Sequence, residues 1–274
     1  GNEAAPGLVA DVRLPVVSFT GSDKVGFEIQ KAVPSKHITL ELGGNAAAVV
    51  LEDWNSEKDM TWAASRIATF ANYQAGQSCI SVQRVLIHDS IFEEMTNRIV
   101  AAVSALPNGD PRDEKTVVGP MINEAAAIRV EEWVNEAIKQ GGEILCGGKR
   151  ISETCFEPTV VWNPSQEAKV SKEEIFGPIV CVYPYSDRDE AINLANSLPY
   201  HFQAAVFTKD LDIAFDTVQK LNATAVMVND HTAFRVDWMP FGGRDASGEG
   251  LGGIPYTMRE MTREKLMVVK SKYL

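Results

Sequence analysis

Short apolar runs alternate along the chain with segments in which apolar residues recur every three or four positions. This alternation predicts strands separated by amphipathic helices, which is typical of an α/β fold with a mostly parallel sheet. The predicted strands cover residues 16–19, 37–40, 47–51, 82–88, 159–162, 179–183, 204–207 and 225–229.

Several helix ends are marked by capping residues. Asn123 and Asp210 each precede an amphipathic segment and can accept a hydrogen bond from its first turn, and Gly141 would end the first of these helices. Ser90 followed by Glu93 forms a capping box, which predicts a helix that stops before residue 107.

The chain changes character after Pro240. Glycines become dense there, which predicts a loop that follows an irregular path beside a ligand. These glycines are Gly242, Gly243, Gly248, Gly250, Gly252 and Gly253. The apolar run at 265–270 then predicts a terminal strand, which needs a sheet to join in this subunit or in a neighbouring one.

Composition and charge exclude several classes of partner. The chain has 274 residues and a formal net charge of -11, which argues against nucleic acid or an anionic membrane, because both bind basic surfaces. No apolar run reaches the roughly 18 residues needed to span a bilayer, so we expect a cytoplasmic protein. The cysteines lie apart without metal-ligand spacing, so we expect them to be reduced and to bind no metal. They are Cys79, Cys146, Cys155 and Cys181.

Cys79 is the cysteine whose context suggests chemistry. It follows Gly76 on a loop between a helix that begins after Asn55 or Ser56 and the strand at 82–88. A catalytic thiol needs surroundings that favour the thiolate, because its pKa is otherwise about 8.5. Taken alone, Cys79 would more often be a buried structural cysteine. If it is a nucleophile, iodoacetamide should modify it faster than the other three cysteines.

Glu41 lies between the strand at 37–40 and the pair Gly43 and Gly44, in apolar company. A carboxylate in an apolar cleft has a raised pKa and can take a proton from water near neutral pH. A glutamate that merely caps a loop would explain this residue when it is considered alone.

Two further segments carry polar groups beside a predicted strand. The segment 172–178 contains Glu174 and leads into the strand at 179–183. The segment 18–26 joins a strand, a glycine turn and a helix start, a geometry that points backbone N–H groups at an anion such as phosphate. It matches neither the dinucleotide-binding fingerprint nor the Walker A loop.

Together these segments resemble the NAD(P)-dependent aldehyde dehydrogenase superfamily. The resemblance covers essentially the whole chain and implies an aldehyde dehydrogenase catalytic domain with a mostly parallel twisted sheet, plus a remnant of the Rossmann-like cofactor domain. We expect the remnant at 1–44, the catalytic domain at 45–240, and the glycine-rich loop with a bridging or oligomerisation strand at 241–274. The motifs are Phe19-Thr20-Gly21-Ser22, Leu40-Glu41-Leu42-Gly43-Gly44, Gly76-Gln77-Ser78-Cys79, Glu174-Ile175-Phe176-Gly177-Pro178 and Pro240-Phe241-Gly242-Gly243.

The resemblance implies a role for each motif. Cys79 is the nucleophile, whose own backbone N–H contributes to the oxyanion hole, and Glu41 is the general base for hydrolytic water. The thiolate adds to the aldehyde, hydride passes to the nicotinamide, and hydrolysis of the thioester gives a carboxylic acid. Phe241 would line the aldehyde tunnel, although ordinary core packing would explain it and Phe176 equally well. The residues expected to bind NAD or NADP are Gly21, Ser22, Gly26, Leu42, Glu174 and Phe176.

The substrate is only partly constrained. The segment 229–240 resembles the lactaldehyde and semialdehyde dehydrogenase-like branches, and its Arg235 could pair with a substrate carboxylate or phosphate. A structural salt bridge to an aspartate would explain Arg235 as well. Some branches that act on phosphorylated or acidic aldehydes carry Arg immediately before the nucleophile. This chain has Ser78 there, which argues against a strongly anionic substrate.

Three other functions share parts of this signature. A CoA-acylating relative would use Cys79 but needs no hydrolytic base, so Glu41 argues against it. A cysteine hydrolase needs a histidine partner, and no motif ties His37 or His88, the nearest in sequence, to Cys79. A non-catalytic protein on the same fold would not need both Cys79 and Glu41.

Little sequence precedes the predicted base. A dinucleotide-binding domain uses several βαβ units of about 30 residues or more, whereas 40 residues precede Glu41. We therefore expect the carboxy-terminal part of a longer enzyme. By resemblance, the other part holds most of the adenosine pocket and the Asn that completes the oxyanion hole, so the 274-residue chain alone should be inactive. The longer enzyme should be a homodimer or homotetramer.

Overall fold

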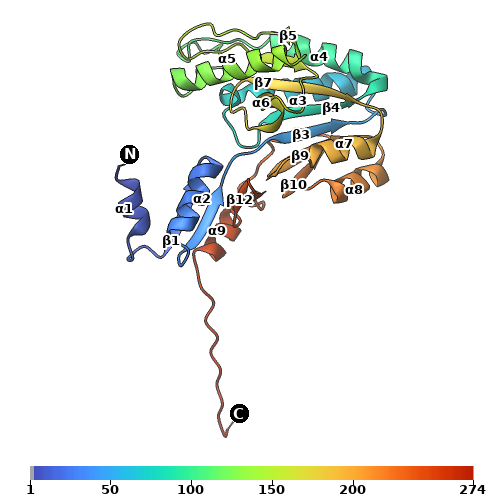
Figure 1. Cartoon of the computed structure of the whole chain (residues 1–274). Helices are drawn as coiled ribbons and strands as arrows, with labels where there is room; N and C mark the ends of the chain where they lie inside the picture. The colour runs from blue at the N-terminus through green and yellow to red at the C-terminus, as the bar shows by residue number, and fades with distance from the viewer. Residues whose placement is uncertain (1–2, 274) are drawn as a thin grey trace.

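A seven-stranded sheet in the order β10-β9-β3-β4-β7-β6-β5 forms the centre of the computed structural model, which describes residues 3–273 (Figure 1). Neighbouring strands run parallel, except that β5 and β6 are antiparallel. This confirms the predicted α/β class. The strands are β3 (Ala46–Val50), β4 (Val82–His88), β5 (Glu143–Cys146), β6 (Thr159–Trp162), β7 (Ile179–Tyr185), β9 (Gln203–Phe207) and β10 (Ala225–Val228).

Helices cover both faces of this sheet, so its central strands are almost continuously apolar, as expected for buried parallel strands. Alternate strand residues contribute to two large apolar clusters. One cluster packs against α3 (Glu57–Asn72) and α4 (Phe92–Ser104). The other packs against α5 (Glu124–Lys139), α7 (Arg188–Ala195) and α8 (Leu211–Lys220), and a short helix, α6 (Lys169–Lys172), precedes β7.

A second, three-stranded sheet is much smaller. Its order is β1 (Val16–Thr20), β2 (His37–Glu41), β12 (Gly248–Glu249), with β1 parallel and β12 antiparallel to β2. Helices α1 (Ala5–Ala10) and α2 (Asp23–Ala32) belong to the same part of the chain. No residue of β1 is buried. The buried core of this part is limited to Val33, Ile38, Leu40 and Leu42.

Several short elements complete the described fold. They are the 3₁₀ turns η1 (Tyr73–Gly76) and η2 (Asp89–Ile91), the strands β8 (Tyr200–His201) and β11 (Arg244–Asp245), and the helix α9 (Ile254–Glu260). No helix of the described residues is long and apolar enough to cross a membrane.

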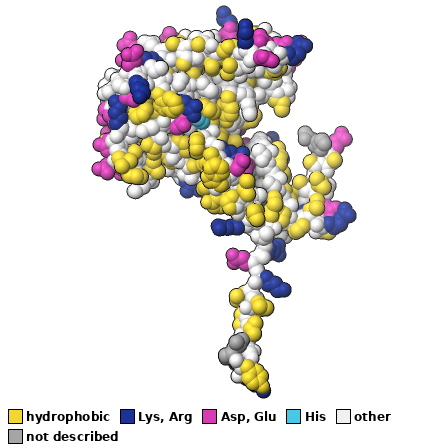
Figure 2. Space-filling view, turned by 180° about the vertical axis from the view of Figure 1, so that it is seen from behind, with side chains coloured by type: hydrophobic (Ala, Val, Ile, Leu, Met, Phe, Trp, Pro, Cys, Tyr) yellow, Lys and Arg dark blue, Asp and Glu magenta, His cyan; other side chains and the backbone are white. Residues whose placement is uncertain are grey.

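The predicted terminal strand has no partner within the described part of the chain, and its pairing with a neighbouring subunit stays a prediction. After α9 the chain is extended and leaves the body (Figure 1), and residues 265–270 pair with no strand of the described part. A strand needs a hydrogen-bonded partner, and none lies beside this tail. Its apolar side chains are largely in solvent, with Leu266 87% exposed, and they form part of the apolar surface visible in Figure 2.

The helix caps give a mixed result. Asn123 accepts a hydrogen bond from the backbone N–H of Ala126, and Asp210 accepts one from that of Ile213, as predicted. The capping box at Ser90 is wrong, because the chain forms the 3₁₀ turn η2 there and α4 begins only at Phe92. The Ser90 N–H donates instead to the His88 ring, 3.2 Å away.

Candidate active site

Cys79 lies on the loop between η1 and β4, as the sequence predicted. Three successive residues before it, Gln74, Ala75 and Gly76, have left-handed backbone angles, with φ of 51°, 56° and 68°. The first two pay a steric cost that glycine avoids. At Gly76 a side chain is impossible for a second reason, because a Cβ would lie 1.9 Å from the Gly177 carbonyl oxygen. The cysteine loop and the segment 174–178 therefore touch through their backbones.

Neighbouring groups fix the position of the cysteine loop. The Tyr73 hydroxyl donates to the Ser78 hydroxyl at 2.5 Å, and the Thr232 hydroxyl donates to the Ile80 carbonyl at 2.7 Å. On the other side, a Cβ at Gly44 would lie only 2.0 Å from the Cys79 carbonyl oxygen. The glycine thus lets the segment after β2 approach the cysteine at backbone distance.

A cleft of about 520 Å³ brings most of the predicted site residues together. Its walls come from the small sheet, the cysteine loop, α5 and the segment after α6. The lining residues are Thr20, Gly21, Ser22, Glu41, Leu42, Gly43, Gln74, Gln77, Ser78, Cys79, Arg129, Glu174 and Phe176. Residues from widely separated positions of the chain therefore form one pocket around a thiol and two carboxyl groups.

Glu41 ends β2 and is half-buried at the cleft. Burial raises the pKa of its carboxyl group, while the Arg235 guanidinium lowers it in part. The glycine-rich loop passes directly beside this carboxylate, since a Cβ at Gly252 would lie 2.6 Å from Glu41 Oε1. The glycine-rich loop, which the sequence predicted to lie beside a ligand, therefore lies beside Glu41, the predicted base.

Glu174 faces the same cleft from the opposite wall. Its carboxylate accepts a hydrogen bond of 2.9 Å from the backbone N–H of Gly44. Burial raises the pKa of Glu174 to about 7; the Asp23 carboxylate raises it too, whereas the Gly44 N–H and the Arg129 guanidinium lower it. The carboxyl group therefore changes charge near neutral pH.

The surroundings of Cys79 do not favour a thiolate, contrary to the expectation from sequence. Burial, and then the charges of Glu174 and Glu41, raise the pKa of Cys79 to about 12, while its own backbone N–H and Arg235 lower it only in part. The thiol is thus protonated at neutral pH in this state.

Three predicted residues lie outside the cleft lining. Gly26 is buried within α2, where a Cβ would lie 2.5 Å from a methyl group of Leu42, so it allows the helix to pack closely on that residue. Phe241 is buried against Ile80 and Phe202, next to Cys79. Arg235 lies over the Phe241 ring, with 4.4 Å between the guanidinium carbon and the ring centroid.

Arg129 is a cleft residue that the sequence reasoning missed. It extends from α5, packs over the Trp133 ring at 4.7 Å, and lowers the pKa of Glu174. Its signal was weak, because an arginine in the first turns of an amphipathic helix is usually a solvated surface charge. Only the fold brings this helix face to the cleft.

No histidine of the described residues lines the cleft, which removes the partner that a cysteine hydrolase would need. His37 pairs with Glu260 at 2.7 Å, His88 with Ser90, and His201 with Asp245. His231 stacks on Phe70. Within the same part of the chain, no group of three acidic, cysteine or histidine side chains could hold a metal ion.

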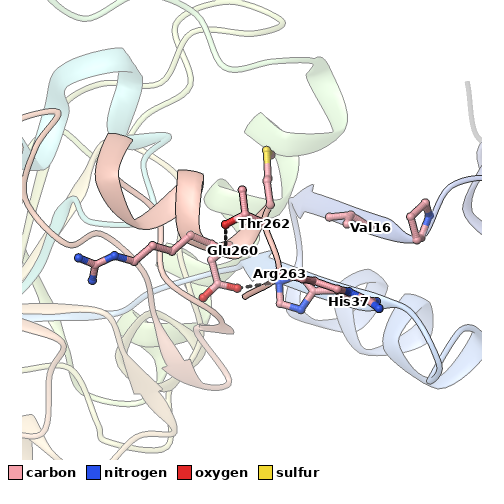
Figure 3. A pocket seen from close by; sticks show the side chains of 8 residues that line it. Val16, His37, Glu260, Thr262 and Arg263 are labelled. Carbon is pink, nitrogen blue, oxygen red and sulfur yellow. Dashed lines mark hydrogen bonds and ion pairs between the residues drawn. The ribbon is translucent and has the colours of Figure 1, made fainter. Parts of the chain in front are cut away.

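Another hollow, of about 590 Å³, lies where α9 meets the small sheet (Figure 3). Val16, His37, Glu260, Thr262 and Arg263 lie around it, and the His37–Glu260 pair closes one side. It contains no cysteine and shares no residue with the Cys79 cleft. We therefore place the chemistry in the Cys79 cleft.

Comparison with known sequences gives matches over nearly the whole chain. Residues 1–267 match the sequence profile described as the aldehyde dehydrogenase family. The 3-sulfolactaldehyde dehydrogenase of Priestia aryabhattai is 39% identical over 269 residues, which are 98% of this chain and 55% of that protein. The lactaldehyde dehydrogenase of Methanococcus maripaludis strain C7 is 38% identical over 257 residues, 94% of this chain and 54% of that protein. The chain thus spans about half the length of these curated relatives.

Solved structures show the same fold. Aldehyde dehydrogenase 21 from Physcomitrella patens, in complex with the reaction product succinate, superposes with a TM-score of 0.90 at 39% identity over 95% of this chain and 53% of that chain. An aldehyde dehydrogenase of Mycobacterium tuberculosis complexed with NAD+ gives 0.92 at 30% identity over 99% of this chain and 56% of that chain.

Proposed function

Because this chain belongs to the aldehyde dehydrogenase family, we propose that it carries the catalytic centre of an enzyme that oxidises an aldehyde to a carboxylic acid. Cys79 is the nucleophile and Glu41 is the base. The observation that carries this proposal is that both side chains line one cleft with Glu174, although the three residues lie far apart in sequence.

Cys79 and Glu41 act in successive steps. The thiol gives its proton to solvent as the sulfur bonds to the aldehyde carbon and the carbonyl electron pair moves to oxygen. When the C=O bond re-forms, hydride leaves the carbon for the acceptor that the cofactor would supply, and a thioester remains on Cys79. Glu41, as a carboxylate, accepts a proton from water as that water attacks the thioester. The acid departs and the sulfur takes the proton from Glu41, which regenerates the thiol and the carboxylate.

The cleft residues fit the phosphate and ribose parts of NAD or NADP. Gly21 and Ser22 line the cleft just before the N-terminus of α2, where the helix dipole favours an anion, although the Gly21 N–H itself donates to the Glu41 carbonyl. Glu174 has a carboxylate available for ribose hydroxyls, and Gly43 lies beside it so closely that a Cβ would be 2.6 Å from Glu174 Oε2. Leu42 and Phe176 supply apolar surface for a planar ring. The cofactor, when bound, supplies the hydride acceptor.

Arg235 is the residue we assign to the substrate. It influences both Cys79 and Glu41 electrostatically, and it takes part in no ion pair among the described residues, so the alternative of a structural salt bridge to aspartate lacks support. The related proteins named above act on 3-sulfolactaldehyde and lactaldehyde, or hold succinate. We propose a short aldehyde with a hydroxyl or acidic group.

Arg235→Gln tests this substrate assignment. Loss of a charge-assisted hydrogen bond, about 1.5–3 kcal/mol, should lower kcat/KM for succinate semialdehyde roughly 10- to 100-fold. The value for butyraldehyde, which has no charge, should change little. An equal loss for both aldehydes would remove Arg235 from substrate recognition.

Activity is proposed for a longer polypeptide that contains this chain as its carboxy-terminal part, in a homodimer or homotetramer. The small sheet supports this proposal, because one glycine turn provides little surface for an adenosine. In that polypeptide Cys79→Ala should abolish NAD(P)H formation from aldehyde, since no covalent adduct can form. The Cys146→Ala variant, which changes a cysteine of β5 outside the cleft, serves as control and should keep most activity.

Rapid mixing of enzyme, aldehyde and cofactor, followed at the absorbance of reduced nicotinamide, measures this effect. Steady turnover by Cys79→Ala would refute the proposal. The 274-residue chain, assayed in the same way, should show no turnover. Turnover by the short chain would mean that it, or its oligomer, builds a complete site.

A further inference from the structure

Two buried carboxamides hold the backbone around Glu174, and neither belongs to a motif that the proposed mechanism uses. They are Gln83 on β4 and Asn45 just before β3. Their exposed fractions are 5% and 2%. Burying a carboxamide costs free energy unless its polar atoms are hydrogen-bonded, so the hydrogen bonds of these two side chains offset that cost. Both point at the same short stretch, residues 171–175.

Gln83 brackets Glu174 on both sides. Its Nε2 donates to the Glu173 carbonyl at 2.7 Å, and its Oε1 accepts from the Ile175 N–H at 3.2 Å. One carboxamide thus binds the peptide groups immediately before and after the carboxylate residue, as a neighbouring strand would. The residue that follows Ile175, Phe176, has a left-handed backbone with φ of 47°. Because this conformation is unfavourable for a side chain of its size, the surrounding contacts must hold the segment in place.

Asn45 adds a second set of hydrogen bonds to the same backbone. Its Nδ2 donates to the carbonyls of Ser171 and Glu173, at 3.2 and 3.0 Å. Gly44, the residue before it, donates its N–H to the Glu174 carboxylate. The side chain of Glu174 and the backbone beside it are therefore both bound to two consecutive residues, 44 and 45.

A buried arginine fixes Asn45 in turn. Arg84, which is 1% exposed, donates to the Asn45 carbonyl at 3.1 Å and to the carbonyls of Leu194 and Ala195 at 2.8 and 3.0 Å. The last two carbonyls lie at the end of α7. The segment that carries Glu174 is thereby connected, through Asn45 and Arg84 of β4, to the end of α7.

We propose that Gln83, supported by Asn45, is a positioning residue that holds the Glu174 carboxylate at the cleft and so sets the affinity for the cofactor ribose. This inference rests on the proposed function, in which Glu174 accepts hydrogen bonds from that ribose. Gln83 touches neither the cleft nor the thiol, so it acts through Glu174 alone.

Gln83→Met is the test variant, because methionine has nearly the same length and no hydrogen-bonding amide. The matched control is Gln203→Met, which changes an equally buried glutamine on β9 that does not contact residues 171–175. If Gln83→Met fails to fold, Gln83→Asn retains the amide but shortens its reach. Circular dichroism melting of each variant measures the fold.

Two readouts separate positioning from a general structural role. In the longer polypeptide, calorimetric titration with NAD and NADP should give a Kd at least about tenfold weaker for Gln83→Met, since a misaligned carboxylate loses a charge-assisted hydrogen bond to the ribose. In the 274-residue chain, the Gly44 amide resonance should titrate with its carboxylate partner in wild type. That titration should disappear in Gln83→Met. Gln203→Met should alter neither readout.

An intact Gly44 titration together with an unchanged Kd in folded Gln83→Met would overturn the proposal. Equal weakening by both glutamine variants would overturn it too, because that result indicates only loss of packing. If wild type binds no nicotinamide cofactor, the proposed function fails instead. The Gly44 resonance then still decides whether Gln83 positions Glu174.

Discussion

The two walls of the Cys79 cleft are built from regions that differ sharply in packing. The wall with Cys79 and Glu174 belongs to the seven-stranded body, whose strands β3 and β9 are buried at every position. The wall with Gly21, Ser22 and Glu41 belongs to the small sheet, where β1 has no buried residue. Apolar side chains near this sheet, such as Leu8 and Val16, remain exposed.

This difference divides the proposed catalytic pair, because Cys79 lies on the well-packed body and Glu41 ends a strand of the small sheet. Cys79 and Glu174 lie where backbone contacts and buried hydrogen bonds fix them. Gly21, Ser22 and Glu41 lie on a sheet with a small core, which has little capacity to hold its shape alone. We infer that the wall with Cys79 is preformed, whereas the wall with Glu41 depends on further packing.

Substitution at Gly44 should have the largest effect, because there the two walls touch. Gly44→Ala would place a methyl group 2.0 Å from the Cys79 carbonyl oxygen, and neither backbone can yield without moving the thiol. We expect kcat/KM to fall roughly 100-fold, the cost of about 1 Å of displacement. Gly119→Ala, where a Cβ meets no atom within 4 Å, is the control. Normal turnover by Gly44→Ala would show that the contact is not maintained in solution.

Cofactor affinity should depend on pH through Glu174. Hydrogen bonds from ribose hydroxyls need the carboxylate form, and the pKa of Glu174 is about 7, so the charged fraction rises as pH increases through this value. Between pH 6 and 8 the Kd should fall about tenfold. Glu174→Gln should abolish this dependence. Calorimetric titrations at several pH values provide the measurement, and an equal slope in wild type and variant would assign the titration to another group.

The same group should affect stability in the opposite direction. The pKa of Glu174 is higher in the folded chain than its ordinary value, so the folded state binds more protons between about pH 4.3 and 7. Its contribution to the free energy of unfolding is fully present below this window and is lost as pH rises through 7. Thermal melts of wild type and Glu174→Gln across this range test the sign.

Gly252→Ala should have the smallest effect of these changes. Its methyl group would lie 2.6 Å from Glu41 Oε1, at the free end of a flexible side chain that can move aside, and 2.9 Å from the Phe241 carbonyl oxygen, so the loop must shift slightly as well. We expect a several-fold slower hydrolysis of the thioester and an unchanged first turnover. Stopped-flow traces distinguish the two phases. Equal slowing of both phases would mean that the loop affects the wall with Cys79 as well.

The sequence predicted most of the body correctly, because strands buried on both faces are unbroken apolar runs. It failed where a feature depends on distant parts of the chain. Ser90 and Glu93 have the spacing of a capping box, but the chain forms a 3₁₀ turn at Ser90 and the helix begins later, at Phe92. The run at 265–270 has the apolar character of a strand but pairs with no described strand of this chain, so its pairing with a neighbouring subunit stays a prediction.

The candidate site shows the same division. Cys79, Glu41 and Glu174 each lie in short local motifs, so sequence reasoning could find them. Arg129 and Gln83 belong to an ordinary helix and an ordinary strand, and only the fold brings them to Glu174 or its backbone. The high pKa of Cys79 was also invisible, because burial and two distant carboxylates cause it.

The central claim is that Cys79 carries the acyl group and Glu41 releases it. The most direct measurement is mass spectrometry of Glu41→Gln in the longer polypeptide, quenched in acid after mixing with aldehyde and cofactor. The account predicts a burst of about one reduced cofactor per site and an acyl adduct on the peptide that contains Cys79. Wild type, quenched at steady state, should show much less of this adduct. Rapid turnover by Glu41→Gln, or an adduct on Cys146 in place of Cys79, would contradict the account.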